Sequence, residues 1–442
     1  MLKAMNSTSR YWWFALAVVL LIGLGGRLWL ANRNTFPSVD GVFYLEQSRQ
    51  LIREGTLPFS SFPPGWPMLA AIVLAFLDCE NSLNVLRAGQ VANVFFGTAL
   101  PLLTFLLIRR RAGPAGALMG AVFITVLPLN LLLSKGDLSE MSYACFILTA
   151  ALLARKKTDF SVGLLLLIVP YLLFIRVTSG IWSLSSKALF LSRSVTGNSP
   201  VEFVNMVADN MVTFLAMLPD LIGLPLVLLA VWGAWCGRGR WLVFLTPLLP
   251  LPLFDFAMAP RYWAPYLPFL LLAALIGIRQ IAQVAAKIRP NAGRPLAVGI
   301  LGLAAVLGFM QAAQDETSDL LRNQESYFGL KASGKWLSSR VTIETAVAGY
   351  KPYASFWAGC RFIQYSQTEP DYLKIIEDAR QRGARFLVVN YYVTRHFMPG
   401  LGFLLTNPEH PSLQGKITLV KFSQYSQEAQ TTAIFEINDA LP

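Results

Sequence analysis

Long apolar runs separated by short polar segments fill the first 314 residues of the sequence. Several runs carry no charge over roughly 16–20 residues, which is about the length of helix that crosses a bilayer core. About nine membrane-spanning helices are predicted, near residues 11–30, 83–108, 114–133, 141–154, 160–175, 217–236, 241–257, 264–279 and 295–313. A further run, 64–77, is too short to cross comfortably, so we expect a re-entrant or interfacial helix there, with a full span as the alternative.

The pattern changes near residue 315, where charged residues become frequent and the apolar stretches shorten. Residues 370–384 carry Leu373, Ile376 and Ala379 or Arg380 at helical spacing, which predicts an amphipathic helix. Three strands are predicted, at 385–392, 416–423 and 432–438. These elements indicate a small α/β domain with a core of its own.

Charge decides how these elements face the membrane. The chain has 37 Lys and Arg against 25 Asp and Glu, and the basic residues cluster at 109–111, 155–157 and 238–240 between apolar runs. By the positive-inside rule these clusters are cytoplasmic, as is the N-terminus. The excess of positive charge is therefore a membrane signal and gives no reason to expect nucleic acid.

Two domains follow from this topology. The first is a transmembrane domain over 1–314 with external loops at 31–82 and 177–216, and the second is an external α/β domain over 315–442. We expect a polytopic protein in the inner membrane of a bacterium with the α/β domain in the periplasm.

Several chemistries are disfavoured by what the sequence contains. The chain has only two histidines, His396 and His410, both near its end. This argues against a histidine-based metal centre or a Ser-His-Asp triad in the membrane part. No glycine-rich phosphate loop follows a predicted strand and opens a helix, so a nucleotide site is not expected. A disulfide between Cys79 and Cys360 remains open.

An isolated acid, Asp40, lies just after the first predicted membrane helix. It precedes a stretch, 42–55, that predicts an amphipathic helix along the external membrane surface. Apolar residues such as Val42 and Ile52 form one side, and we place Arg49 on the polar side. Asp40 is either the N-cap of this helix or a catalytic carboxylate, since Asp suits both roles.

Three more charged positions lie on the same predicted face of the membrane. Asp137 and Glu140 fall in the next external loop, and Arg261 begins a late helix with Tyr262 beside it. Ionisable groups at membrane depth are costly, so they are candidates for function. The structural alternatives are a helix cap for Glu140 and an interfacial anchor for Arg261.

A carboxylate and an arginine on the outer face suit glycosyl transfer from a lipid-linked sugar phosphate. The carboxylate takes the proton of an acceptor hydroxyl, which attacks the anomeric carbon. The lipid phosphate leaves, and the cation stabilises its growing charge. This reaction needs neither histidine nor a nucleotide.

At these residues the chain resembles the GT-C superfamily of integral-membrane glycosyltransferases, with most likeness to the bacterial aminoarabinose transferase and protein O-mannosyltransferase branch. The motifs that carry the resemblance are "SVDGVFYLEQSRQLIREGTLPFSSFPPGWPML" (38–69), "LSEMSYACFILTALLARKK" (138–157), "RYWAPYLPFLLLAAL" (261–275) and "VAGYKPYASFWAGCRFIQY" with "ARQRGARFLVVN" in the last domain. The resemblance implies a polyprenyl-phosphate-sugar donor and a lipid, envelope glycan or protein acceptor.

The resemblance also implies roles for individual residues. Asp40 matches the first-loop acid, a catalytic base or acceptor-orienting carboxylate, and Glu140 matches the second-loop acid, which we also expect to be catalytic. Arg261 matches a late arginine that contacts the donor phosphate.

The residues expected around these three to bind substrate are Tyr262, Tyr44, Asp137, Lys135 and Lys351, with ordinary surface positions as the alternative for the two lysines. The first external loop has a single Asp, Asp40, at the position where some relatives have an Asp-Glu pair. We therefore expect no cofactor, and a divalent metal has no support beyond the oligosaccharyltransferase relatives.

Two functions of other classes compete with an enzyme. A transporter or flippase of lipid-linked sugars would show repeated halves or broken helices near the bilayer midplane. Here the acids gather on one face and no internal repeat is evident. A non-catalytic envelope-assembly subunit would tolerate replacement of Asp40.

Overall fold

The computed structural model of the chain describes residues 7–38, 40–57, 64–153, 169, 172–173, 175–177, 180, 200–236, 260–288, 327–365, 369–425 and 430–438. The chain divides into two compact units. The helical unit comprises 1–34, 57–69 and 89–317, and the mixed unit comprises 35–56, 70–88 and 318–442. The predicted helices 241–257 and 295–313 lie outside the described residues, and most of the predicted helix 160–175 does as well.

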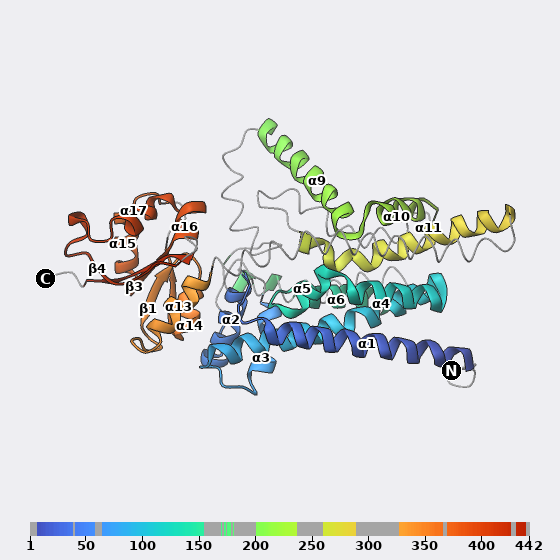
Figure 1. Cartoon of the computed structure of the whole chain (residues 1–442), viewed down its shortest axis with the longest axis horizontal. Coiled ribbons are helices and arrows are strands. Elements are labelled where there is room, and N and C mark those ends of the chain that lie inside the picture. The colour runs from blue at the N-terminus through green and yellow to red at the C-terminus, as the bar shows by residue number, and fades with distance from the viewer. Residues whose placement is uncertain are drawn as a thin grey trace. The chain divides into compact units, whose positions relative to one another are not determined.

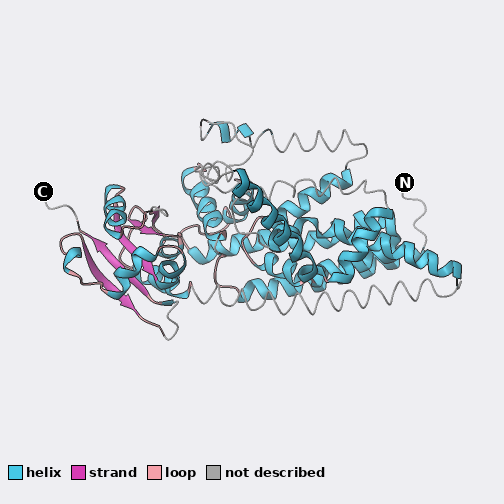
Figure 2. Ribbon diagram, turned by 90° about the horizontal axis from the view of Figure 1, so that it is seen from above, coloured by secondary structure: helices cyan, strands magenta, loops and turns pink. Residues whose placement is uncertain are grey.

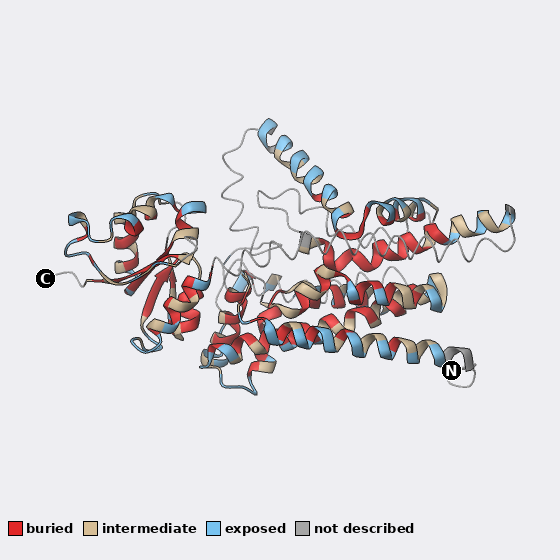
Figure 3. Cartoon of the chain, in the orientation of Figure 1, coloured by how far each residue is buried: buried red, intermediate tan, exposed pale blue. Residues whose placement is uncertain are grey.

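Apolar helices make up the described part of the helical unit (Figure 1). They are α1 (Ser7–Arg33), α5 (Pro128–Lys135), α6 (Glu140–Leu153), α9 (Pro200–Ile222), α10 (Leu224–Cys236), the 3-10 helix η3 (Pro260–Tyr266) and α11 (Leu267–Ile288), with α3 (Gly65–Leu74) and α4 (Ser82–Val126) beginning in one unit and ending in the other. Among the described residues, three helices are long and apolar enough to cross a membrane, and the bent pair α9–α10 would make a fourth. Large apolar side chains are exposed along α1, including Phe14, Leu21 and Ile22 (Figure 3), as suits a lipid-facing helix.

Several predicted boundaries differ from the structure. The predicted helices 83–108 and 114–133 meet in α4 at Gly113, where the backbone leaves the helical region (φ 79°, ψ 176°). The second helix was predicted too long: it ends at Val126, because Pro128 cannot continue the hydrogen-bond ladder and starts α5. The short run after residue 64 forms the ten-residue helix α3, which at 1.5 Å per residue extends about 15 Å, half a bilayer core.

The predicted helix 217–236 ends where the structure has it, at Cys236, but its start is wrong and it is broken by a bend. Helix α9 begins at Pro200, inside the expected loop 177–216, and it ends before Gly223. Gly223 has a φ of 81°, in the left-handed region, and the chain turns there by 111° into α10. The predicted helix 264–279 was too short, because no helix breaker occurs before Pro290 and α11 runs through Arg279 to Ile288.

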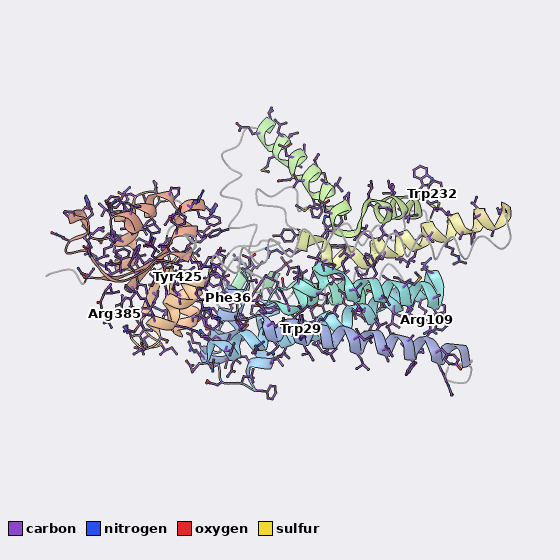
Figure 4. The ribbon with its side chains drawn as sticks, viewed as in Figure 1. Trp29, Phe36, Arg109, Trp232, Arg385 and Tyr425 are labelled. Atoms are coloured by element: carbon purple, nitrogen blue, oxygen red, sulfur yellow. The ribbon has the colours of Figure 1, made fainter. Side chains whose placement is uncertain are left out.

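The helical unit has two chemically different ends. At one end Arg109 lies over the ring of Trp13 at 5.2 Å (Figure 4), Arg110 donates to Leu152 O at 3.1 Å, and Arg279 donates to Arg111 O at 3.0 Å. Leu152 lies near the end of the 14-residue helix α6, about 18 Å along the helix axis from its first residue, Glu140. The basic cluster 109–111 therefore lies at the opposite end of α6 from Glu140.

A five-stranded mixed sheet forms the centre of the mixed unit (Figure 2), in the order β2-β1-β3-β5-β4. The strands are β1 (Ala346–Gly349), β2 (Arg361–Gln364), β3 (Ala384–Asn390), β4 (Ile417–Ser423) and β5 (Thr432–Ile437). β1 pairs in parallel with β2 and β3, whereas β3–β5 and β5–β4 are antiparallel, with Leu387 opposite Phe435. The three predicted strands are confirmed, and the short strands β1 and β2 were not predicted.

Helices complete the mixed unit. They are α2 (Gly41–Glu54), α13 (Phe328–Leu337), α14 (Tyr353–Ala358), α15 (Tyr372–Gln381), α16 (Tyr391–His396) and α17 (Gly402–Thr406), with the 3-10 turns η4 (Pro399–Leu401) and η5 (Pro411–Leu413). The predicted amphipathic helix is α15. It buries Ile376 and Ala379 in the core beside Leu387, while Arg380 stays outside and pairs with Glu377.

The amphipathic helix predicted after Asp40 is confirmed as α2, but one side of it was misassigned. Arg49, placed on the polar side, is fully buried, and Gln47 is buried as well, whereas Ile52 is exposed. The reason is that α2 packs on α14 of its own unit, so the helix has a second covered face that periodicity alone does not reveal.

Candidate active site

In the helical unit, Arg261 of η3 forms an ion pair with Glu140, the first residue of α6. Arg261 Nε lies 3.4 Å from Glu140 Oε1, and the two side chains are 24% and 12% exposed. The guanidinium also lies 5.4 Å from the ring centre of Tyr262. Because both charges are largely removed from solvent, their attraction is stronger than that of a surface pair.

The short helix η3 is fixed on two sides, which sets the position of Arg261. Tyr266 and Tyr143 of α6 join their hydroxyl groups at 3.2 Å. On the other side Trp263 stacks on Phe214 of α9 with ring centres 4.3 Å apart and donates to the Phe214 carbonyl at 2.9 Å. Each contact joins an aromatic face to a hydrogen bond, so η3 has little freedom to rotate.

A second polar cluster holds the loop that carries Lys135 and Asp137. Asn93 of α4 donates to Leu138 O at 2.9 Å and to Leu133 O at 3.4 Å, and its own carbonyl accepts from Trp66 Nε1 at 3.1 Å. Asn93 thereby ties both ends of the loop to α4 and α3. Asn93 and Trp66 were not predicted, because an amide and an indole in apolar runs give no sequence signal.

The two loop residues lie where this cluster places them. Asp137 is fully buried, and Lys135 is partly buried with its carbonyl accepting from Asn34 Nδ2 at 3.3 Å. Burial lowers the pKa of Lys135, since desolvation disfavours the ammonium form.

In the mixed unit, Asp40 forms an ion pair with Lys351, which follows β1. Lys351 Nζ lies 3.7 Å from Asp40 Oδ1, and the side chains are 17% and 21% exposed. The ammonium also lies 5.0 Å from the ring centre of Phe43. The Asp40 carboxylate is thus electrostatically stabilised and still reachable by a solute.

Asp40 occupies the N-cap position of α2 without capping it. Its side chain makes no capping hydrogen bond, and the hydroxyl of Ser38 instead accepts from the Gly41 amide at 3.0 Å. The segment before it is anchored by Tyr353, whose hydroxyl donates to Pro37 O at 3.2 Å. The interpretation of Asp40 as a simple N-cap is therefore not supported, because the Ser38 hydroxyl makes the capping hydrogen bond.

A cluster of aromatic residues, of which Tyr327 and Tyr353 are buried, lies beside the Asp40 segment. Tyr353 stacks on Tyr327 with ring centres 4.5 Å apart, and Tyr392 meets Tyr327 edge-on at 5.5 Å. Burial raises the pKa of Tyr327, and the charges of Tyr392, Tyr350 and Asp40 raise it further. Tyr327 therefore stays a neutral phenol beside the carboxylate.

Arg49 of α2 holds this helix against neighbouring segments of the mixed unit. It donates to Cys79 O at 3.2 Å, to Ser82 Oγ at 2.8 Å and to Phe356 O at 3.3 Å, and it pairs with Glu46 at 3.0 Å. One guanidinium thus joins α2, the start of α4 and α14. Tyr44, one turn before Arg49 on α2, is buried, with its carbonyl accepting from Ser48.

The expected site residues thus form two groups. Glu140, Arg261, Tyr262, Asp137 and Lys135 belong to the helical unit, whereas Asp40, Tyr44 and Lys351 belong to the mixed unit. In the described part of the chain, no group of three or more His, Cys, Asp or Glu side chains is arranged to hold a metal ion. Asp40 and Glu140 each face a cation, an arrangement that does not fit a divalent metal.

The combination of apolar helices and a small sheet unit recurs in solved structures of low sequence identity. The chain superposes on the crystal structure of ArnT from Cupriavidus metallidurans bound to undecaprenyl phosphate with a TM-score of 0.55 at 11% identity, over 98% of each chain. ArnT in the apo state gives 0.54 at 13% identity, over 97% of this chain and 98% of that one.

A third structure is the archaeal oligosaccharyltransferase AglB from Archaeoglobus fulgidus in complex with an inhibitory peptide and a dolichol-phosphate. It gives a TM-score of 0.55 at 10% identity, over 89% of this chain and 72% of that one. At these identities the likeness establishes a common fold. No protein-family model matches the sequence, and neither does any curated protein.

Proposed function

We propose that this chain transfers a sugar from a polyprenyl-phosphate-linked donor to the hydroxyl group of a lipid, an envelope glycan or a protein. The reaction takes place on the outer face of a bacterial inner membrane, with the N-terminus in the cytoplasm and the α/β domain in the periplasm. One observation carries the proposal: the fold is shared, over nearly the whole length of both chains, with a structure that holds undecaprenyl phosphate. The AglB structure, which holds a dolichol-phosphate, adds support.

Asp40 acts as the general base in this proposal. Its carboxylate takes the proton of the acceptor hydroxyl while the hydroxyl oxygen bonds to the anomeric carbon of the sugar. Two features support the role: the carboxylate keeps 21% of its surface exposed, and Ser38 rather than Asp40 caps α2. Lys351, 3.7 Å away, is the counter-ion of this carboxylate.

Arg261 stabilises the leaving group. As the bond from the anomeric carbon to the phosphate oxygen breaks, its electron pair stays on the lipid phosphate, and a guanidinium suits that charge. Glu140, expected from the sequence to be catalytic, positions Arg261 through the 3.4 Å ion pair, and Tyr262 packs beside it. Lys135, Asp137 and Tyr44 shape the binding regions, and no step requires a metal ion.

The test is sugar transfer by purified protein in detergent, with a radiolabelled undecaprenyl-phosphate hexose or pentose and extracted envelope lipids as acceptors. We expect Asp40→Asn to lower the rate by about 10²–10⁴-fold, the range for loss of a general base. Arg261→Ala should lower it by about 10²–10³-fold, as for other groups that stabilise developing negative charge.

Matched control variants are Asp378→Asn and Arg385→Ala, which change the same residue types at exposed positions of the mixed unit. They should transfer sugar at the parent rate. Equal transfer by the parent, Asp40→Asn and Arg261→Ala would remove both assignments. A protein that moves the labelled donor across vesicles without breaking the sugar–phosphate bond would be a flippase instead.

A further inference from the structure

The mixed unit contains a cleft of about 410 Å³ that the proposed transfer reaction does not use. It lies within that unit, because all its walls come from the unit's own segments. Its walls include the polar and aromatic residues Thr35, Glu80, Lys331, Lys335, Ser338 and Trp357. A volume of this size is typical of sites for small organic molecules.

Two lysines of α13 give the cleft its charge. Lys331 and Lys335 are four residues apart on one helix, so they share a face. The Lys331 ammonium lies 4.2 Å from the ring centre of Phe36 (Figure 4) and 4.5 Å from that of Trp357, and it donates to Thr35 O at 2.8 Å. It is therefore held in place and faces the second cation across one helical turn.

The other charged groups at the cleft do not neutralise the two lysines. Glu80 is the acid on the wall, and it forms an ion pair with Arg53 of α2. The hydrogen bond from Arg53 lowers the pKa of Glu80, so the pair is ionised and close to neutral as a whole. Burial, and then the charge of Lys335, lowers the pKa of Lys331 to about 8. The negative charge of a bound anion would favour the ammonium form and so raise this pKa.

A buried donor provides an independent indication. Trp357 is 9% exposed, and its Nε1 has no hydrogen-bond partner among the residues that the structure describes. Buried polar groups are satisfied in the great majority of cases, so an exception on the wall of a cleft requires an explanation. An oxygen atom of a ligand bound against Trp357 would supply the acceptor.

We propose that this cleft binds the phosphate group of a small phosphate ester, about the size of a hexose phosphate or a phospholipid head group. Lysine ammonium groups bind phosphate as point charges. The rest of the volume takes the organic part, next to the polar groups of Thr35 and Ser338. The site is distinct from Arg261, which lies in the other unit, and it does not depend on the transfer reaction.

The test is calorimetric titration of the full-length protein in neutral detergent at pH 8. The soluble probes are glucose 6-phosphate, inorganic phosphate and glucose. We expect glucose 6-phosphate to bind more tightly than inorganic phosphate, and glucose not to bind. The pKa of Lys331 is lowered to about 8, so at pH 8 binding of an anion should be accompanied by proton uptake, measured by repeating the titration in buffers of different ionisation enthalpy.

A lipid source is tested in nanodiscs of phosphatidylglycerol against phosphatidylcholine, with protection of Lys331 and Lys335 from an amine-reactive reagent as the readout. Protection by phosphatidylglycerol alone, without binding of glucose 6-phosphate, would identify a lipid head group as the phosphate ester. Binding of the soluble ester would identify a free solute. No binding of either, or equal binding of glucose, would overturn the proposal.

Variants separate this site from the donor phosphate site. The double variant Lys331→Gln/Lys335→Gln should weaken binding at least tenfold and abolish proton uptake. The single variant Lys335→Gln changes an exposed residue, so it should weaken binding about threefold without disturbing the packing. Trp357→Phe keeps the ring and removes the N–H, and should weaken binding about threefold. Lys374→Gln, an exposed lysine of α15, and Arg261→Ala should bind as the parent does. Undiminished binding by the double variant would contradict the proposal.

Discussion

Single buried polar residues fix local geometry in this protein at positions where the sequence shows no motif. Arg27 of α1 is fully buried and donates to Ser134 Oγ at 3.2 Å and to Gly23 O at 3.0 Å. Gly97 provides the space, since a Cβ there would come within 2.7 Å of Ser134 Cβ. Arg49 has the same role in the mixed unit, and both are satisfied by oxygen atoms that only the folded chain brings together.

Replacing Arg49 by alanine should loosen the contact between α2 and α14. The change leaves the Cys79 and Phe356 carbonyls without this donor and Glu46 without its cation, which costs about 2–4 kcal/mol. The opening equilibrium of segments 41–54 and 353–358 should then rise by about 30–1000-fold, measured by native-state hydrogen exchange of the full chain.

The matched control is Arg382→Ala, which removes an exposed arginine that pairs with Asp378 on the same unit. It should change the exchange of those segments by less than a factor of about three. Unchanged protection in Arg49→Ala would show that α2 is held by its apolar contacts alone.

Helices of the helical unit meet through small residues. Gly233 of α10 and Gly277 of α11 face each other, and a Cβ on Gly233 would lie 2.7 Å from Gly277 N and against the Ala273 carbonyl. Close backbone approach over glycine is the usual way for apolar helices to associate in a membrane. The crossing of α10 and α11 therefore depends on these two positions.

Gly233→Ala should lower the thermal stability of the protein in detergent, because the added methyl group meets backbone atoms that cannot move aside. Overpacking of this kind costs about 1–3 kcal/mol. Gly26→Ala in α1 is the control: a Cβ there meets nothing within 4 Å, so the melting temperature should stay the same or rise slightly. Equal melting temperatures for the two variants would show that α10 and α11 can separate at no cost.

Elements were predictable to different degrees. Long apolar runs and the alternating strands of the mixed unit were located from the pattern, because burial on one side leaves a period in the sequence. The bend at Gly223 and the strands β1 and β2, four residues each, were missed. A single glycine and a four-residue run are too short to give a period, and tertiary pairing decides them.

At the scale of the whole molecule, segments distant in sequence share one unit. Residues 35–56 and 70–82, expected to belong to an external loop, and 83–88, expected to begin a membrane helix, fold with 318–442. The loop that carries Asp40 is thereby part of the same folded body as Lys351. Its rigidity comes from the contacts of Tyr353 and Arg49 across that body.

The proposed orientation predicts opposite accessibility for two exposed positions. In a chain whose Cys79, Cys145, Cys236 and Cys360 are replaced, Gln381→Cys should react with a membrane-impermeant maleimide in intact cells with a permeable outer membrane. Arg110→Cys should react only after lysis, because its basic cluster is cytoplasmic by the positive-inside rule. Labelling of both positions from the same side would contradict the orientation.

The sequence by itself determined the classes of element, the change from apolar to mixed composition near residue 315, and the charged residues that stand out against an apolar background. These are local properties, written in composition and periodicity. Only the tertiary structure decided that Glu140 pairs with Arg261 and Asp40 with Lys351, and that Arg49 is buried. Those pairings join residues more than a hundred positions apart. Their geometry depends on how helices and strands pack, and no single segment of the sequence specifies that packing.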